Sequence, residues 1–363
     1  MSSSFGDLFR ITLFGESHGS CVGVVIDGCP AGLSLKEADI QGEVDKRKPA
    51  AQAGQTARRE EDKVEILSGV FKGRTTGAPM CLLVWNKDTD STEYEKTKNT
   101  PRPGHADYTA FVKYGGFNDY RGGGRFSGRI TVGLVMAGAL AKKILNLKGI
   151  EVLAHTVQIG SIKAGEPTYD QIRTRTYKNA LRCADTKAAK KMLEEVKQAE
   201  LEGDSLGGVI EGLALNLPLG LGEPYFETLE GQLSKALYAI PAIKGVEFVA
   251  GFRVAEMKGS QNNDPFRIKG GKIVLDTNNA GGILGGISDG MPLLLRAVVK
   301  HTPSIAQKQK SVDLQTMQDV EMAVKWLHDV CLAPRATILV ESMMALTICD
   351  FALGAGLIER VIK

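Results

Sequence analysis

The sequence lacks several features that would assign it to a class at once. Its six cysteines form no CxxC pair and no closely spaced set, so it predicts neither a disulfide framework nor a metal site, and we expect inert thiols in a reducing compartment. No run approaches the roughly 18 consecutive apolar residues of a membrane span. The N-terminus has no basic segment followed by a long apolar one. We therefore expect a cytoplasmic protein with no membrane contact.

Two further shortages exclude classes of partner. The net charge of +3 on 363 residues is too small to drive binding to nucleic acid or to an anionic membrane surface. The chain has no GxxxxGK[ST] motif and no GxGxxG motif that follows a strand, so the common nucleotide-binding loops are excluded. A hydrophobic fraction of 43% and a charged fraction of 24% are typical of an ordinary globular protein.

Residues 100–131 concentrate the polar chemistry of the chain. They hold four arginines, one histidine, two aspartates and the glycine run 122–124. Consecutive glycines allow left-handed turns whose N–H groups converge on an oxygen-rich ligand, and the forks of Arg121, Arg125 and Arg129 match carboxylate or phosphate. The apolar pattern of residues 132–147 predicts a helix whose positive N-terminal end faces the same place. The alternative is a glycine-rich surface loop with solvated arginines.

A second polar segment lies between two predicted strands, residues 8–14 and 22–28. It contains His18, flanked by a serine and a glycine, which could donate a proton to an anionic leaving group; the alternative is a solvated histidine in a turn. Ser34 and Glu37 then predict a capping box for a helix that ends near Lys46. The cationic cluster at that end, which includes Arg47, either caps the helix or reaches an acidic ligand.

The remaining pattern predicts an α+β fold with antiparallel sheets, because strands occur in runs with no regular βαβ alternation. The predicted strands are residues 64–71, 80–85, 152–162, 207–217, 245–252 and 292–299. The predicted helices are residues 229–239 and 334–353, with a long charged helical region at 169–202 that we interpret as a solvated excursion or an oligomer arm. We expect loops at residues 50–62, which we interpret as mobile, and at 87–100. His155 is expected to be an ordinary packing residue, and Asp107 and Asp119 to be structural partners of arginines.

Several motifs, in order and in register, resemble the chorismate synthase family. They are GESHG at 15–19, RPGHAD at 102–107, GGGR at 122–125, TNNAGG at 277–282 and His-Asp at 328–329, with VEILSG at 64–69, TTG at 75–77 and KGVE at 244–247. The resemblance covers roughly residues 10–350. It implies a single domain over residues 1–363, with a β-α-β sandwich of antiparallel sheets around central helices, in a homotetramer.

The resemblance also implies a reaction. It is the anti 1,4-elimination of phosphate from 5-enolpyruvylshikimate 3-phosphate to give chorismate, with reduced FMN as cofactor. Electrons would come from NADPH or through a separate flavin reductase, and the sequence leaves both open. The alternative is a catalytically impaired relative that keeps the fold and flavin or anion binding.

Site roles are carried over from the family onto matching positions. His18 would protonate the departing phosphate, His105 would lie near the flavin, and Asp329 would assist proton removal. Ser17 and Ser127 would hydrogen-bond substrate and flavin. Substrate binding is assigned to Arg47, Arg102 and Arg129. Flavin contacts are assigned to Arg125, Phe126, Ser127, Ala242, Gly285, Lys300, His301, Thr302, Pro303, Ser304 and Leu327.

Some positions depart from the family pattern. Leu327 and Ala53 stand where the family usually has arginine, Phe126 replaces a serine, and His301 replaces a proline. A missing charge-assisted contact typically weakens binding by roughly 1.5–3 kcal/mol. We expect a neighbour such as Lys325 or Arg335 to substitute at position 327, or binding to be weaker.

Overall fold

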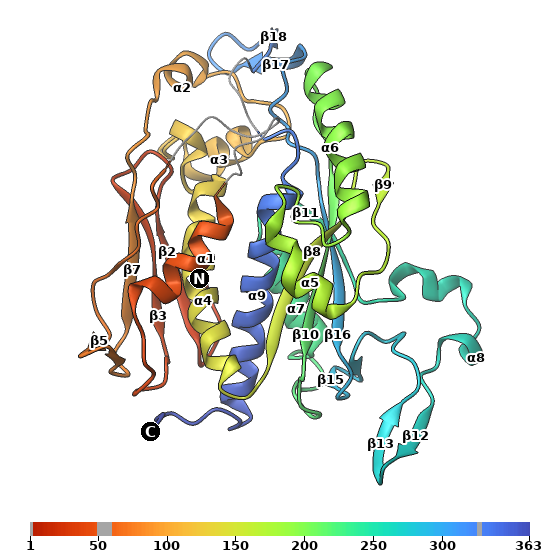
Figure 1. The fold of residues 1–363 in the computed structure, drawn as a ribbon. Coiled ribbons are helices and arrows are strands. Elements are labelled where there is room, and N and C mark those ends of the chain that lie inside the picture. The colour runs from red at the N-terminus through yellow and green to blue at the C-terminus, as the bar shows by residue number, and fades with distance from the viewer. Residues whose placement is uncertain (1–2, 49–59, 325–328) are drawn as a thin grey trace.

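The computed structural model describes residues 3–48, 60–324 and 329–363, and it places one antiparallel sheet on each side of a helical layer (Figure 1). In the first sheet, alternating β-branched residues bury one face, as in β3 with Val22, Val24 and Ile26 fully buried. Its strands, in spatial order, are β1 (Ser4–Phe5), β2 (Arg10–Gly15), β3 (Cys21–Asp27), β7 (Met80–Trp85) and β4 (Glu65–Ile66).

The second sheet lies on the other side of the helices and is also antiparallel throughout. Its order is β11 (Ile243–Glu247), β16 (Leu293–Val299), β10 (Gly208–Leu215), β8 (Glu151–Ile159) and β9 (Ile162–Lys163). Together the two sheets confirm the predicted α+β class and the sandwich architecture.

Helices α1 (Glu37–Arg47), α4 (Val132–Asn146), α7 (Leu229–Tyr238) and α9 (Ala333–Gly354) form the central layer. Small residues bring α4 and α9 close together, since a Cβ on Gly138 would lie 2.4 Å from Ser342 Cβ. By length and composition α9 could cross a membrane, but 89% of its apolar stretch is buried inside the molecule. We conclude that α9 is a core helix.

A buried ion network joins three of these helices. Lys142 Nζ on α4 lies 2.7 Å from Glu43 Oε2 on α1 and 2.7 Å from Glu341 Oε2 on α9. The second oxygen of Glu341 accepts hydrogen bonds from the Tyr177 hydroxyl (2.8 Å) and the Ala154 N–H (3.1 Å). Burial lowers the pKa of Lys142, but the two carboxylates outweigh it and raise the pKa above its ordinary value. Lys142 therefore keeps its charge at neutral pH.

Shorter elements gather at one end of the sandwich, uppermost in Figure 1. They are α2 (Thr92–Thr97), α3 (Asp107–Tyr114), and the hairpin of β17 (Gln309–Asp313) and β18 (Gln318–Met322). Contacts that join these segments include Ser311 Oγ to Pro101 O at 2.5 Å. Because loops from distant parts of the chain meet here, this end is where polar side chains can converge.

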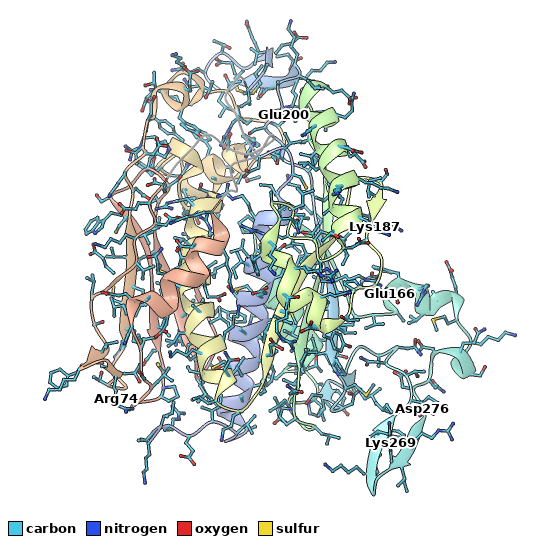
Figure 2. The ribbon with its side chains drawn as sticks, in the orientation of Figure 1. Arg74, Glu166, Lys187, Glu200, Lys269 and Asp276 are labelled. Atoms are coloured by element: carbon cyan, nitrogen blue, oxygen red, sulfur yellow. The ribbon has the colours of Figure 1, made fainter. Side chains whose placement is uncertain are left out.

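At the opposite corner an arm projects from the molecule. It comprises α8 (Gly259–Asn262), β12 (Phe266–Lys269) and β13 (Lys272–Leu275). Figure 2 shows Lys269 and Asp276 on this arm, away from the helical layer, whereas Lys187 and Glu200 lie along α6 (Thr186–Leu201). The remaining elements are β5 (Val70–Phe71), β6 (Arg74–Thr75), β14 (Ile283–Leu284), β15 (Ile287–Ser288), α5 (Tyr169–Arg175), and the 3-10 turns η3 (Thr176–Lys178) and η4 (Gly251–Glu256).

Several predicted boundaries were wrong. The first helix begins after Lys36, whose N–H donates to Asp39 Oδ2 at 2.9 Å, while Ser34 pairs with Arg74 in a bridge. The predicted strand at 64–71 is two short strands, and the strand at 245–252 ends early, at Glu247. Residues 87–100 contain α2, and the helical region 169–202 is divided into α5, η3 and α6. Most of the predicted loop at 50–62 lies outside the described residues.

Candidate functional site

The glycine run forms a compact turn inside η1 (Arg121–Phe126), which is followed by η2 (Gly128–Thr131) and then α4. Gly122, Gly123 and Gly124 have φ values of 59°, 80° and 53°, which favour glycine. A Cβ on Gly122 would lie 2.4 Å from His18 Cδ2 and 2.7 Å from Ser17 Oγ. The turn therefore lets the backbone pack directly against both predicted catalytic side chains. One of its N–H groups, that of Gly123, bonds inside the turn to Tyr120 O (3.1 Å).

His18 lies between β2 and β3 and is supported by α2. Its Nδ1 is 2.8 Å from Ser91 Oγ, and its ring meets the Tyr94 ring edge-on with the centroids 5.3 Å apart. Ser17 is fully buried, and its Oγ is 3.2 Å from Ser127 Oγ. The structure thus brings three of the five predicted catalytic residues together.

Two of the predicted substrate arginines share one carboxylate. Arg47 NH1 lies 3.6 Å from Asp62 Oδ2, and Arg129 NH1 pairs with Asp62 Oδ1. Arg47 also donates to Thr131 Oγ1 (3.2 Å) and Gly128 O (2.7 Å). Burial lowers the pKa of Arg47 to about 9, with the charge of Arg335 the next largest cause. The cluster is thus a buried group of two guanidiniums around one carboxylate, and guanidiniums are the side chains that match carboxylate or phosphate groups.

The third substrate arginine is separately neutralised. Arg102 makes a fork-to-fork pair with Asp107, with Nε–Oδ2 at 2.8 Å and NH2–Oδ1 at 2.9 Å. Burial raises the pKa of Asp107, but the bonds and charge of Arg102 outweigh it, so the pKa falls below its usual range. The Arg102 guanidinium also lies 5.4 Å from the centre of the Tyr94 ring. The prediction that Asp107 and Asp119 are structural partners of arginines is confirmed, because Asp107 pairs with Arg102 and Asp119 pairs with Arg121 at 2.9 Å.

The segment that follows β16 and the residues around the start of α9 complete this end of the molecule. Asp329 Oδ2 accepts from Arg335 NH1 at 2.6 Å, and Thr302 Oγ1 donates to the Asp329 carbonyl. His105 Nε2 lies 2.6 Å from Ser304 Oγ, and Lys300 Nζ donates to Gly104 O at 2.8 Å. The segment 300–304, which includes His301 and Pro303, is therefore fastened to the loop that carries His105.

Other predicted flavin positions lie farther out or outside the described residues. Arg125 donates to Ser3 Oγ at 2.8 Å, and Phe126 is 43% exposed. Ala242 adjoins the segment 300–304, since its carbonyl accepts from Lys300 N (2.9 Å). Gly285 lies in the β14–β15 turn, beside the N-terminus of α7. Ala242 lies beyond the C-terminus of the same helix, so the two predicted flavin positions are at opposite ends of α7. Positions 53, 325, 327 and 328 lie outside the described residues.

Four residues of the site were not predicted from the sequence: Asp62, Asn86, Ser91 and Tyr94. Asn86 accepts from Arg129 Nε at 2.9 Å. Asp62, Ser91 and Tyr94 stand in stretches interpreted as loop, and Asn86 directly follows the predicted strand 80–85. No periodic pattern at these positions distinguishes a side chain that points inward. His155 is fully buried in β8, as predicted for a packing residue, with Nε2 3.3 Å from Glu211 Oε1. Burial raises the pKa of the Cys29 thiol to about 12, in keeping with an inert cysteine.

The two-sheet sandwich and its arginine-rich end fit an enzyme that acts on a small anionic molecule. Comparisons with known proteins identify the class further. The profile of the family described as chorismate synthase matches residues 9–353. A chorismate synthase of Dehalococcoides mccartyi is 57% identical over 363 residues, which is 100% of each chain. One of Korarchaeum cryptofilum is 52% identical over 346 residues, covering 95% of this chain and 96% of that one.

A solved structure agrees with the sequence relatives. A crystal structure of chorismate synthase superposes with a TM-score of 0.77 at 28% identity, covering 97% of this chain and 93% of that one. The chain belongs to the chorismate synthase family, which confirms the resemblance noted from its motifs. Its function is accordingly that of a chorismate synthase, a lyase of the shikimate pathway and of aromatic amino-acid biosynthesis.

Proposed function

We propose that this chain eliminates phosphate from 5-enolpyruvylshikimate 3-phosphate at the arginine-lined end of the sandwich, with reduced FMN as cofactor. The observation that carries the proposal is the buried pair Arg47 and Arg129. Arg129 N donates to Ser127 Oγ, which lies 3.2 Å from Ser17 Oγ beside the Gly122 turn and His18. The substrate has two carboxylates and a phosphate, and guanidinium forks bind both groups in bidentate fashion. Arg102 is the third substrate arginine in this proposal.

Proton transfer to the departing phosphate is assigned to His18. Its Nδ1 is engaged by Ser91 Oγ at 2.8 Å, and its Nε2 is the ring nitrogen nearest the glycine turn, 2.6 Å from where a Gly122 Cβ would stand. A fixed ring places one nitrogen toward the site and holds the other, which general acid catalysis requires. Ser17 and Ser127, joined at 3.2 Å, supply hydroxyl groups beside it.

The second sheet contributes the residues that would hold the flavin. Burial lowers the pKa of Lys300, and the neighbouring charge of Lys244 adds to the effect. Two adjacent cations together with the hydroxyls of Thr302 and Ser304 fit a phosphate-bearing, hydrogen-bonding cofactor. When bound, reduced FMN supplies the electron-rich ring that the elimination uses. His105, bonded to Ser304, would adjoin it.

Asp329 is assigned to proton removal, and its surroundings bear on the missing family arginine at position 327. Arg335 NH1 lies 2.6 Å from Asp329 Oδ2, and the charge of Arg335 adds to the burial that lowers the pKa of Arg47. A guanidinium is thus present next to the catalytic carboxylate although position 327 is a leucine. We propose that Arg335 substitutes for the missing charge, so that catalysis is retained.

The direct test is anaerobic turnover with purified protein, 5-enolpyruvylshikimate 3-phosphate and chemically reduced FMN. We expect chorismate and phosphate to appear together, and the activity to be lost in His105→Ala and Asp329→Asn. A folded protein that binds flavin and substrate without turnover would show a catalytically impaired relative instead. Repeating the assay with oxidised FMN and NADPH separates an intrinsic reductase activity from supply by a separate flavin reductase.

The proposal includes a homotetramer in the cytoplasm, and the exposed apolar residues of the projecting arm support the association of copies of this chain. Ile268 and Ile273 are 81% and 75% exposed on its hairpin, an unfavourable exposure unless another copy covers them. The combined changes Ile268→Glu and Ile273→Glu should reduce the mass measured by light scattering below that of four chains. Leu201→Glu is the matched control, because Leu201 is 83% exposed at the end of α6. An unchanged mass in the arm variant would contradict this role.

A further inference from the structure

The arginine cluster contains a carboxylate that the proposed reaction does not use. Asp62 is 3% exposed, and each of its oxygens faces a different guanidinium, Oδ2 that of Arg47 and Oδ1 that of Arg129. A phosphate or carboxylate of a ligand would bridge these two side chains in the same way. Asp62 therefore occupies a position that a bound anion would need.

The two arginines have other anchors besides this carboxylate. Arg47 donates to Thr131 Oγ1 at 3.2 Å and to Gly128 O at 2.7 Å. Arg129 donates from Nε to Asn86 Oδ1 at 2.9 Å. These bonds fix the guanidinium groups, so the carboxylate contributes mainly charge and little orientation.

The backbone of Asp62 is held in place by a clamp from α1. Gln41 donates from Nε2 to Asp62 O at 3.0 Å and accepts from Val64 N at 2.9 Å. The residue has φ of 49°, in the left-handed region, which aspartate tolerates better than most residues. The clamp keeps this unusual turn in place and directs the carboxylate into the arginine cluster.

The cluster has one more positive than negative charge. Three guanidinium groups, of Arg47, Arg129 and Arg335, face two carboxylates, of Asp62 and Asp329. Neutralising Asp62 alone would leave one more uncompensated positive charge in a buried region, where charges interact more strongly than in water. Anions that enter the cluster would then be bound more tightly.

We propose that Asp62 is a built-in counter-ion that competes with substrate and product anions for Arg47 and Arg129. The proposal rests on the substrate-binding role proposed above for these two arginines. By neutralising the pair as phosphate departs, Asp62 favours release of that product. The same competition lowers the affinity of the site for inorganic phosphate before substrate binds.

The test measures inorganic phosphate binding to the full-length protein by calorimetry at constant ionic strength. Asp62→Asn keeps the shape and removes the charge, and we expect phosphate to bind about tenfold more tightly, as for one added charge–charge interaction. Phosphate should inhibit turnover at correspondingly lower concentration. Gln41→Ala should shift the affinity in the same direction by a smaller factor. Glu151→Gln, which breaks a surface pair with Arg173 (2.6 Å), should leave it unchanged.

Unchanged or weaker phosphate binding by folded Asp62→Asn would overturn the proposal. If that variant does not fold, Gln41→Ala decides it by the same criterion. If Arg47 and Arg129 do not bind substrate anions, Arg47→Ala and Arg129→Ala will bind phosphate as the wild type does. That result would overturn both the counter-ion role of Asp62 and the substrate-binding role of the two arginines. Loss of phosphate binding in both arginine variants, with no tightening in Asp62→Asn, would overturn the counter-ion role alone.

Discussion

Substitution of Gly122 by alanine tests whether the glycine turn positions His18. A Cβ at this position would lie 2.4 Å from His18 Cδ2, whereas ordinary contact begins at 3.4 Å. The imidazole must therefore move by about 1 Å, a displacement that typically lowers catalysis by about 100-fold. We expect Gly122→Ala to lose about that factor in kcat in the anaerobic assay.

Gly123 provides the matched control. It also has a positive φ, of 80°, but a Cβ there would meet its nearest atoms at 3.8 Å and 3.9 Å. Both alanine variants should lose about 1–2 kcal/mol of stability from the left-handed backbone, measured by denaturant unfolding. Only Gly122→Ala should also lose kcat. Equal activity of the two folded variants would refute the reasoning, because the steric contact with His18 would then be irrelevant to turnover.

Three further predictions concern side chains around the site and in the helical layer. Lys142→Met should lower the free energy of unfolding by about 3–5 kcal/mol, because Glu341 and Glu43 lose a buried partner; an unchanged unfolding midpoint would contradict this. Burial raises the pKa of Glu43, but the charges of Lys142 and Lys46 outweigh burial, so the net pKa is lowered. Its carboxylate therefore stabilises the fold fully above the unfolded-state pKa of about 4.3, and this stabilisation is lost as the pH falls through the folded-state pKa. Glu43→Gln should accordingly be less stable than the wild type at pH 7 and equally stable in acid, as melting curves across pH will show. Ser91→Ala should reduce kcat roughly tenfold, because His18 loses the hydrogen bond that fixes its ring; loss confined to KM would argue against that role.

The fold was predictable wherever one residue pattern sets one element. The helices at 132–147 and 334–353 and the strand at 80–85 have continuous apolar or small-residue patterns, and the structure places α4, α9 and β7 there. Elements without a buried face were missed. α2 buries none of its residues, so no period distinguishes it from a loop, and only its contacts with His18 and Arg102 reveal its importance.

The positively charged residues of the candidate site could be predicted from the sequence, whereas several of the carboxylates that pair with them could not. Arginine and glycine clusters are visible in the sequence because the residues are neighbours, as in 121–129. Asp62 pairs with Arg129 across 67 positions, and Glu341 pairs with Lys142 across 199. Such contacts depend on how the layers of the fold are stacked. Glu341 lies in the otherwise apolar helix α9, and the residues around it in the sequence do not indicate that Lys142 is its partner. Counter-ions at long sequence separation therefore require the structure.

The central position of α9 has a consequence for how the chain reaches its native state. Every strand of both sheets precedes α9 in the sequence, yet this helix packs between α4 and the second sheet, in contact with β8, β10 and β16. Its Asp350 also accepts from the N–H groups of Leu8 and Phe9, 342 and 341 positions away. During synthesis the whole second sheet emerges before α9, the helix that packs on its inner face. We therefore expect slow folding through intermediates with exposed apolar surface, and dependence on chaperones until α9 docks.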